Sequence, residues 1–128
     1  MTWYLTLRAN SRYSCFTQTD SLLEFLAQMP ELQQTGLIEF QSKENYPGVI
    51  IIMAYCDENG GYAIQDKSTY WAKVNVVELI CSSYENWQWY EALASRIAKF
   101  LGWSAFEDIE ERQVWPNIAF NPDGFAAG

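Results

Sequence analysis

The chain has 128 residues, of which 49% are hydrophobic and 16% are aromatic. This length suits one domain with a buried core, and the composition excludes intrinsic disorder despite a net charge of -8. Sixteen acidic side chains against eight basic ones repel phosphate groups, which argues against direct binding of nucleic acid or of anionic membranes.

The cysteines and the N-terminal segment indicate a cytoplasmic protein. Cys15, Cys56 and Cys81 are widely spaced and form no CxxC pair, which argues against a disulfide framework and a zinc site. We expect all three to be small core residues. The N-terminus lacks the pattern of a signal peptide, and the longest apolar run, residues 49–55, is too short to span a bilayer. We therefore expect neither export nor membrane insertion.

The chain begins with a predicted strand and a predicted helix. Apolar and polar residues alternate over residues 2–8, which predicts a half-buried strand. Ser21 and Glu24 have the spacing of a capping box, in which each side chain satisfies a free amide at the start of a helix. Pro30 is expected to close that helix, because proline cannot continue it.

The middle of the chain is rich in strand signals. Alternation over residues 37–41 predicts a second strand, and the continuous apolar run 49–56 predicts a central strand buried on both faces. Residues 57–61 have the composition of a tight turn, after which residues 62–65 are expected to return antiparallel. A further strand is expected over residues 73–81.

A second helix is expected in the last third of the chain. Asn86 stands at a position that caps such a helix, and Gly102 is suited to end it in the left-handed conformation. Apolar residues recur between them at helical spacing, at Trp89, Leu93, Ile97 and Phe100. Ser104 and Glu107 form another capping box, which predicts a short acidic helix or turn.

These elements predict an α+β fold with a single domain, in which two main helices pack on one face of a mostly antiparallel sheet. We place this domain at residues 1–116. Residues 117–128 lack regular periodicity and are expected to form an irregular C-terminal tail.

The sequence lacks several features that are common in enzyme active sites. It contains no histidine, which removes the commonest general base and metal ligand, and it contains no phosphate-binding loop and no GxSxG motif. Residues 57–61 are interpreted as a turn rather than a calcium loop, since the later ligands do not follow. Carboxylates such as Glu78 and Glu91 are expected on a solvated face. We expect no catalytic site, no metal and no cofactor.

The segment from Tyr84 to Trp115 combines large aromatic residues with carboxylates, the combination that suits an interface for a basic partner. On a helical wheel Trp89 lies with the core stripe, whereas Trp87 and Tyr90 lie off its centre and are expected to be exposed. Packing of these rings in the core and solvation of the carboxylates are the alternative. The candidate partner-binding residues are Glu85, Trp87, Tyr90, Glu91, Glu107, Asp108, Glu110 and Glu111.

The order of elements in roughly the first half of the chain is similar to that of a known family. The helix from Ser21 followed by Pro30, the strand to Phe40, the turn at Tyr46 and the long apolar strand 49–56 resemble the small α+β immunity proteins of bacterial polymorphic-toxin and contact-dependent growth-inhibition systems. The resemblance implies a cytosolic antidote that binds one cognate toxin domain, often a nuclease or deaminase with a basic cleft. An acidic protein suits that role, because it is complementary to a basic surface.

Two other functions are consistent with the same sequence. One is a small-molecule-binding or regulatory domain, with a pocket between sheet and helices lined by aromatic residues. The other is an acidic mimic of nucleic acid that inhibits DNA-binding proteins through its carboxylates. An enzyme is the least favoured class.

Overall fold

The computed structural model describes residues 2–59, 61 and 68–116, which form two helices and nine strands. The helices are α1 (Thr19–Ala27) and α2 (Trp87–Leu101). The strands are β1 (Trp3–Arg8), β2 (Thr17–Gln18), β3 (Leu32–Gly36), β4 (Glu39–Ser42), β5 (Val49–Ala54), β6 (Lys73–Val74), β7 (Val76–Cys81), β8 (Ser104–Glu107) and β9 (Gln113–Trp115). Neither helix has the length and the apolar character that crossing a membrane requires.

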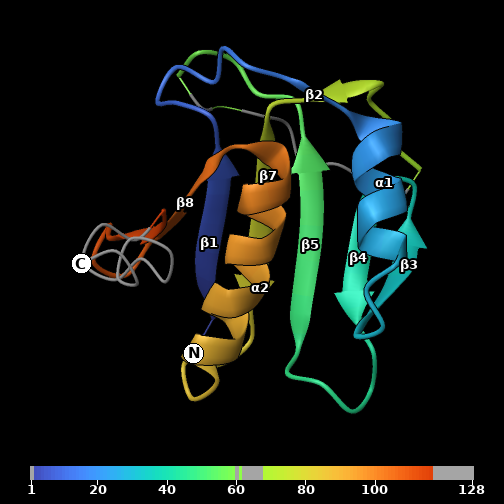
Figure 1. Ribbon diagram of the computed structural model, residues 1–128, viewed down its shortest axis with the longest axis vertical. Helices are drawn as coiled ribbons and strands as arrows, with labels where there is room; N and C mark the ends of the chain where they lie inside the picture. The colour runs from blue at the N-terminus through green and yellow to red at the C-terminus, as the bar shows by residue number, and fades with distance from the viewer. Residues whose placement is uncertain (1, 60, 62–67, 117–128) are drawn as a thin grey trace, which may run out of the picture.

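Seven of the strands form one sheet in the order β3-β4-β5-β7-β1-β8-β9, and neighbouring strands are antiparallel throughout. Strands β2 and β6 form a separate antiparallel pair. Both helices lie in front of the same face of the large sheet (Figure 1). The predicted α+β single domain with a mostly antiparallel sheet and two main helices is therefore confirmed, while the predicted tail at 117–128 lies outside the described residues.

The core lies between this face of the sheet and the two helices. Leu5 of β1 stands opposite Leu79 of β7, which in turn stands opposite Ile51 of β5, so one buried row crosses the three central strands. Leu22 of α1 and Leu93 of α2 cover it and are fully buried. Removing this apolar surface from water is the main force that holds helices and sheet together.

The opposite face of the sheet is only partly buried. In β5, Val49, Ile51 and Met53 are buried, whereas Ile50 and Ile52 remain partly exposed. The prediction that this strand is buried on both faces is therefore wrong. A continuous apolar run shows that a strand is central in its sheet, but it does not show whether both faces are covered, and among the described residues both helices cover the same face.

Helix α1 begins at Thr19, three residues before Leu22, the first helical residue that a capping box at Ser21 predicts. No side chain caps it, so the predicted capping box is wrong. Instead, the backbone N–H of Thr19 donates to the carbonyl of Ala72 at 3.0 Å, and its hydroxyl donates to the carbonyl of Trp71. A partner distant in sequence thus satisfies the helix terminus.

The strand predicted at residues 73–81 is broken at Asn75, whose buried side chain bonds to neighbouring backbone. Its Oδ1 accepts from the N–H of Cys56 at 2.8 Å, and its Nδ2 donates to the carbonyls of Cys56 at 2.8 Å and Tyr13 at 3.0 Å. These bonds replace part of the regular ladder, which separates β6 from β7.

The end of α2 is as predicted, but the segment after it is not. Gly102 has a φ of 72° and the N–H of Trp103 returns to the carbonyl of Ala98 at 2.9 Å, which closes the helix. Residues 104–107 then form strand β8 rather than a capping box, because they pair with the free edge of β1, while the turn expected to follow does form, at residues 108–111. The residues of a capping box carry no information on whether a strand elsewhere in the chain, such as β1, has a free edge.

Two smaller predictions have mixed outcomes. Asp57 accepts hydrogen bonds from the backbone N–H groups of Asn59 and Gly61, so a turn forms there, while the predicted return strand at 62–65 lies outside the described residues. Cys56 and Cys81 are buried as expected, whereas Cys15 is exposed.

Candidate functional site

The chain between β8 and β9 makes a turn at residues 108–111 that carries exposed carboxylates, and we call it the acidic turn. Glu107 directly before it is buried, with 3% of its surface exposed. One oxygen of Glu107, Oε1, accepts hydrogen bonds from the backbone N–H of Glu110 at 2.8 Å and of Arg112 at 2.9 Å. The side chain of Glu107 therefore fixes the backbone of the acidic turn.

A second set of hydrogen bonds ties the acidic turn to strand β1, which lies between β7 and β8 in the sheet. The N–H of Asp108 donates to the carbonyl of Tyr4 at 3.1 Å, and Oδ1 of Asp108 accepts from the N–H of Tyr4 at 2.8 Å. Glu111 adopts a left-handed φ of 56°, which is uncommon for a residue other than glycine. The carboxylates of the turn thus project from a backbone that is held in one conformation.

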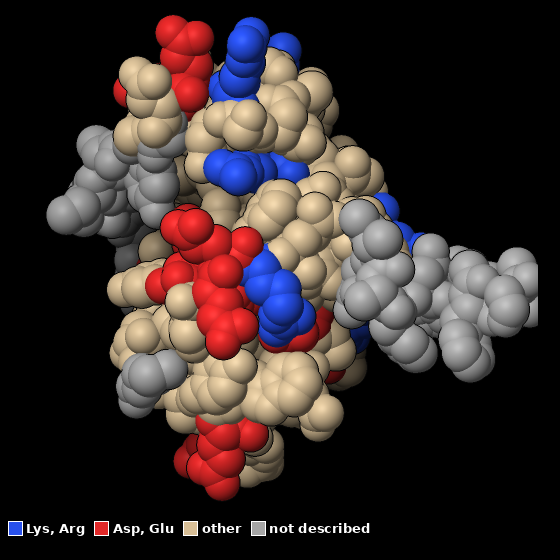
Figure 2. All heavy atoms as spheres, turned by 90° about the vertical axis from the view of Figure 1, so that its left-hand side faces the viewer, with Lys and Arg blue, Asp and Glu red and all other residues tan. Residues whose placement is uncertain are grey.

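Arg112 joins the acidic turn to helix α2. Its guanidinium forms an ion pair with Glu91, and this hydrogen bond, together with the charges of Glu91 and Glu107, raises the pKa of Arg112. Glu91 is therefore already neutralised by a partner. Figure 2 shows a patch of carboxylates in the middle of this side of the molecule beside basic side chains, with further carboxylates at its top and bottom.

A cavity of about 480 Å³ opens beside the turn, on the partly exposed face of the sheet. Its lining includes Asp108 and Glu111 of the turn and Glu78 of β7. Glu78 is half-buried, and its Oε1 accepts a hydrogen bond from the hydroxyl of Thr6 at 2.8 Å. Burial raises the pKa of Glu78 to about 6, and the nearby charge of Asp108 contributes, against the opposite effect of the Thr6 hydroxyl.

Arg8 lines the same cavity between two aromatic rings. Its guanidinium carbon lies 5.4 Å from the ring centre of Tyr13 and 4.9 Å from that of Phe106. Its Nη1 donates to the Tyr13 hydroxyl at 3.0 Å, while its buried Nε has no hydrogen-bond partner among the residues that the structure describes. Because the rings hold this cation, the carboxylates of Glu78, Asp108 and Glu111 remain available to a cation from outside.

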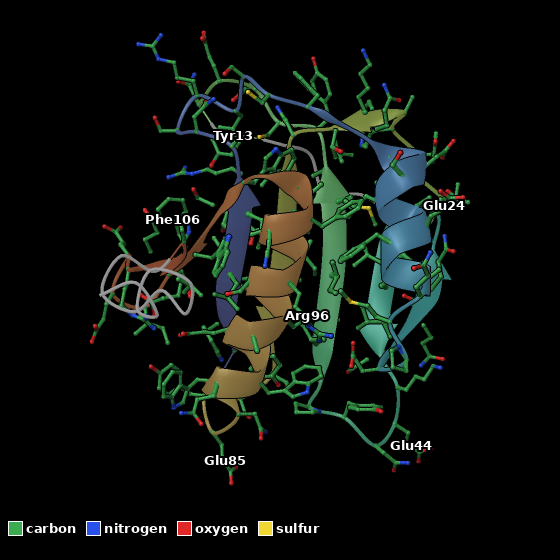
Figure 3. All side chains as sticks on the ribbon, viewed as in Figure 1. Tyr13, Glu24, Glu44, Glu85, Arg96 and Phe106 are labelled. Carbon is green, nitrogen blue, oxygen red and sulfur yellow. The ribbon has the colours of Figure 1, made fainter. Side chains whose placement is uncertain are left out.

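Exposed aromatic side chains lie at the start of α2. Trp87 has 37% of its surface exposed and stacks on Tyr84, with 6.4 Å between the ring centres. Tyr84 in turn packs edge-on against the buried Trp3, with 5.2 Å between the ring centres, and this contact holds the exposed pair against the core. Glu85 between them is exposed, at the lower end of the molecule in Figure 3. Trp87 and Glu85, two of the candidate partner-binding residues, thus lie on the surface.

The expected exposure of Tyr90 is wrong. Its side chain is fully buried, and its hydroxyl donates to the carbonyl of Gly48 at 2.8 Å. Ala94 and Ala98, on the same face of α2, are also fully buried, so the helix packs through this face. The large apolar residues of α2 alone predict a buried face centred near Trp89. Trp89 is only half-buried, because the buried face also includes small residues and lies closer to Tyr90.

The prediction that Glu107 contacts a partner at the surface is also wrong. Its side chain is buried and stabilises the backbone of the acidic turn. Conversely, nothing in the sequence indicates that Arg8 and Phe106 line a cavity with the acidic residues. The partial burial of Glu78 follows from its place in the strand. Glu78 alternates with Val76 and Ile80 on one face of its strand, and a carboxylate between apolar neighbours is expected to be partly buried.

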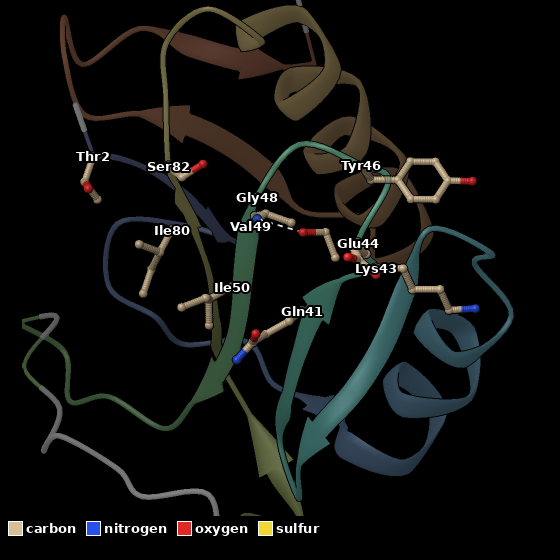
Figure 4. A pocket seen from close by; sticks show the side chains of 11 residues that line it. Thr2, Gln41, Lys43, Glu44, Tyr46, Gly48, Val49, Ile50, Ile80 and Ser82 are labelled. Carbon is tan, nitrogen blue, oxygen red and sulfur yellow. Dashed lines mark hydrogen bonds between the residues drawn. The ribbon is translucent and has the colours of Figure 1, made fainter.

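Another cavity, of about 460 Å³, lies at the ends of β4, β5 and β7 (Figure 4). Its floor includes Ile50 and Ile80, and the side chains of Lys43 and Tyr46 point away from them. Its lining shares no residue with that of the cavity beside the acidic turn. Within the described part of the chain, no three His, Cys, Asp or Glu side chains are arranged to hold a metal ion.

Compared with protein-family models, with curated proteins and with solved structures, the chain matches none of them. The resemblance to immunity proteins therefore stays a prediction. The function has to be inferred from the acidic turn, the cavity beside it and the exposed rings of Tyr84 and Trp87.

Proposed function

We propose that this protein is an immunity protein, an inhibitor that binds a cognate bacterial toxin domain and covers its basic active-site surface. The supporting observation is the acidic turn, in which Asp108, Glu110 and Glu111 are exposed on a backbone fixed by Glu107 and Tyr4. A toxin that acts on nucleic acid presents positive potential, which these carboxylates complement.

The fixed backbone matters for affinity. Ordering a flexible loop on binding costs free energy, and a turn that is already ordered avoids most of that cost. The carboxylates of the acidic turn also lie beside Glu78 at the cavity, so a lysine or arginine side chain that enters there meets several acceptors.

The exposed aromatic residues extend this surface. Trp87 and Glu91 lie one helical turn apart on α2, and Glu91 is paired with Arg112 at the end of the acidic turn. Tyr84 and Trp87 thus supply apolar contact area next to the carboxylates. Aromatic anchors with charged surroundings are typical of residues that dominate binding energy at interfaces.

The proposal is tested by growth protection against the toxin encoded by the neighbouring gene. One variant combines Asp108→Asn, Glu110→Gln and Glu111→Gln, and a matched control combines Glu24→Gln, Glu44→Gln and Glu58→Gln, which removes the same charge from other exposed positions. We expect the wild type and the control to protect cells, and the turn variant to bind the purified toxin at least about tenfold more weakly.

Equal protection by the turn variant would place the interface elsewhere. If the wild type neither binds the toxin nor protects cells, the proposed function itself is wrong. A nucleic-acid mimic would instead inhibit several unrelated DNA-binding enzymes, whereas we expect protection against one toxin.

A further inference from the structure

A groove with an apolar floor and a basic rim lies between the two helices. Its volume is about 520 Å³, and its floor is formed by Phe25 and Met29 together with Pro30 and Phe100. The rings of Phe25 and Phe100 stack across the helices, with 4.0 Å between their centres and 12° between their planes. Phe100 nevertheless keeps 46% of its surface exposed. The groove therefore presents aromatic surface to solvent after the helices have packed.

The rim of the groove carries two of the eight basic residues of this acidic chain, Arg96 and Lys99. They lie three positions apart on α2, and Figure 3 shows Arg96 extending toward the side of α1. Arg96 pairs with Glu31 through Nη2 at 3.1 Å, which holds the guanidinium in place while its other donors remain available. The side chain of Lys99 makes no hydrogen bond or ion pair with another of the described residues.

We propose that this groove binds a small apolar monocarboxylate, such as a medium-chain fatty acid, with its carboxylate between Arg96 and Lys99. The two cations and Glu31 leave one net positive charge at the rim, which matches a single carboxylate. The apolar floor matches a hydrocarbon or aromatic body. The proposal does not depend on toxin binding.

The size of the groove favours a small ligand over a protein. Sites for small molecules usually measure about 300–1,000 Å³, and they often lie between packed helices. A stable protein interface would bury about 800 Å² on each partner, which is far more surface than these few lining residues provide.

The test uses sodium decanoate and the full-length protein, with isothermal titration calorimetry and thermal unfolding. We expect saturable binding with one site, a dissociation constant of roughly 100 µM and a higher melting temperature. The neutral analogue 1-decanol should bind about fivefold more weakly, because it lacks the charge that pairs with the rim. Hexanoate should bind more weakly than decanoate, since it buries fewer methylene groups.

Two variants with matched controls locate the site. Lys99→Gln should weaken decanoate binding by about fivefold, whereas Lys73→Gln, which removes an exposed positive charge elsewhere, should not change it. Phe100→Ala should also weaken binding, and Ile109→Ala, which removes a comparably exposed apolar side chain, should not.

The proposal is overturned if decanoate shows no saturable binding, if decanol binds equally well, or if Lys99→Gln leaves the affinity unchanged. Binding of an acidic helical peptide at this groove without binding of decanoate would overturn it as well. Since the Lys99 variant alters an exposed side chain outside the core, misfolding does not obscure the result.

Discussion

Two glutamates with unusual surroundings shape the candidate site at the scale of single residues. Glu107 is buried and serves the backbone of the acidic turn, whereas Glu78 is half-buried at the adjacent cavity. Both are predicted to lie on the surface when their charge alone is considered. Their burial makes each one sensitive to a single substitution, although in different ways.

Glu107→Ala should destabilise the protein by about 2–3 kcal/mol. The substitution removes the acceptor of two backbone N–H groups, those of Glu110 and Arg112, and leaves them without that partner. Urea unfolding followed by tryptophan fluorescence measures the change. The control Glu110→Ala alters an exposed side chain of the same turn and should cost less than about 0.5 kcal/mol. Equal stability of the two variants would contradict this role of Glu107.

Glu78→Gln should stabilise the protein above about pH 6, by about 2 kcal/mol. Below its ordinary pKa of 4.5, Glu78 holds a proton in both the folded and the unfolded state, so it does not affect stability. Between pH 4.5 and 6 the unfolded state releases the proton first, which favours unfolding, and above pH 6 this cost is complete.

Urea unfolding at pH 4.5 and at pH 7.5 tests the Glu78 prediction. The variant should exceed the wild type in unfolding free energy only at the higher pH. Glu24→Gln, on the exposed side of α1, should differ little from the wild type at both values. A difference for Glu78→Gln that is the same at both values would rule out the titration of this carboxyl as its cause.

Element boundaries are set by contacts from distant parts of the chain at several points. Helix α1 begins where Thr19 reaches the carbonyl of Ala72, and the break between β6 and β7 forms where Asn75 bonds to Cys56. Strand β8 exists because β1 offers a free edge. By contrast, Gly102 ends α2 through its own backbone conformation, and this boundary follows from the sequence.

Asn75→Ala should destabilise the protein by about 3 kcal/mol. The side chain of Asn75 makes three hydrogen bonds to backbone groups of Cys56 and Tyr13, and their loss leaves polar groups unpaired where the chain is buried. Asn86→Ala is the matched control, because Asn86 stands at the start of α2 but its side chain makes no capping bond. It should cost less than about 0.5 kcal/mol by the same urea measurement, and a comparable loss in both variants would show that Asn75 has no special role.

Charge is unevenly distributed over the whole molecule. The acidic turn and its cavity lie where β1 meets β8, while Arg96 and Lys99 line the groove between the helices. A net charge of -8 would by itself attract any basic partner. This distribution of charge predicts that a basic partner is attracted most strongly to the side of the fold that carries the acidic turn.

The association rate constant with a basic toxin domain should therefore fall by about tenfold between 50 and 500 mM NaCl, with a smaller change in the dissociation rate. The triple variant of the acidic turn should lose most of this salt dependence, whereas the equally charged control with Glu24, Glu44 and Glu58 replaced should keep it. Stopped-flow fluorescence measures both rates. The same salt dependence in both variants would mean that net charge alone guides encounter.

The sequence by itself determined the fold class, the half-buried strand β1, the left-handed end of α2 at Gly102 and the lack of histidine. Each of these depends on composition or on residues close together in the chain, where local conformational preference and periodicity act. Only the tertiary structure decided that Tyr90 and Glu107 are buried, that residues 104–107 extend the sheet and that Glu78 borders a cavity. These features depend on which strand edge is free and which helix face meets the sheet, and such contacts between distant residues leave no periodic pattern in the chain.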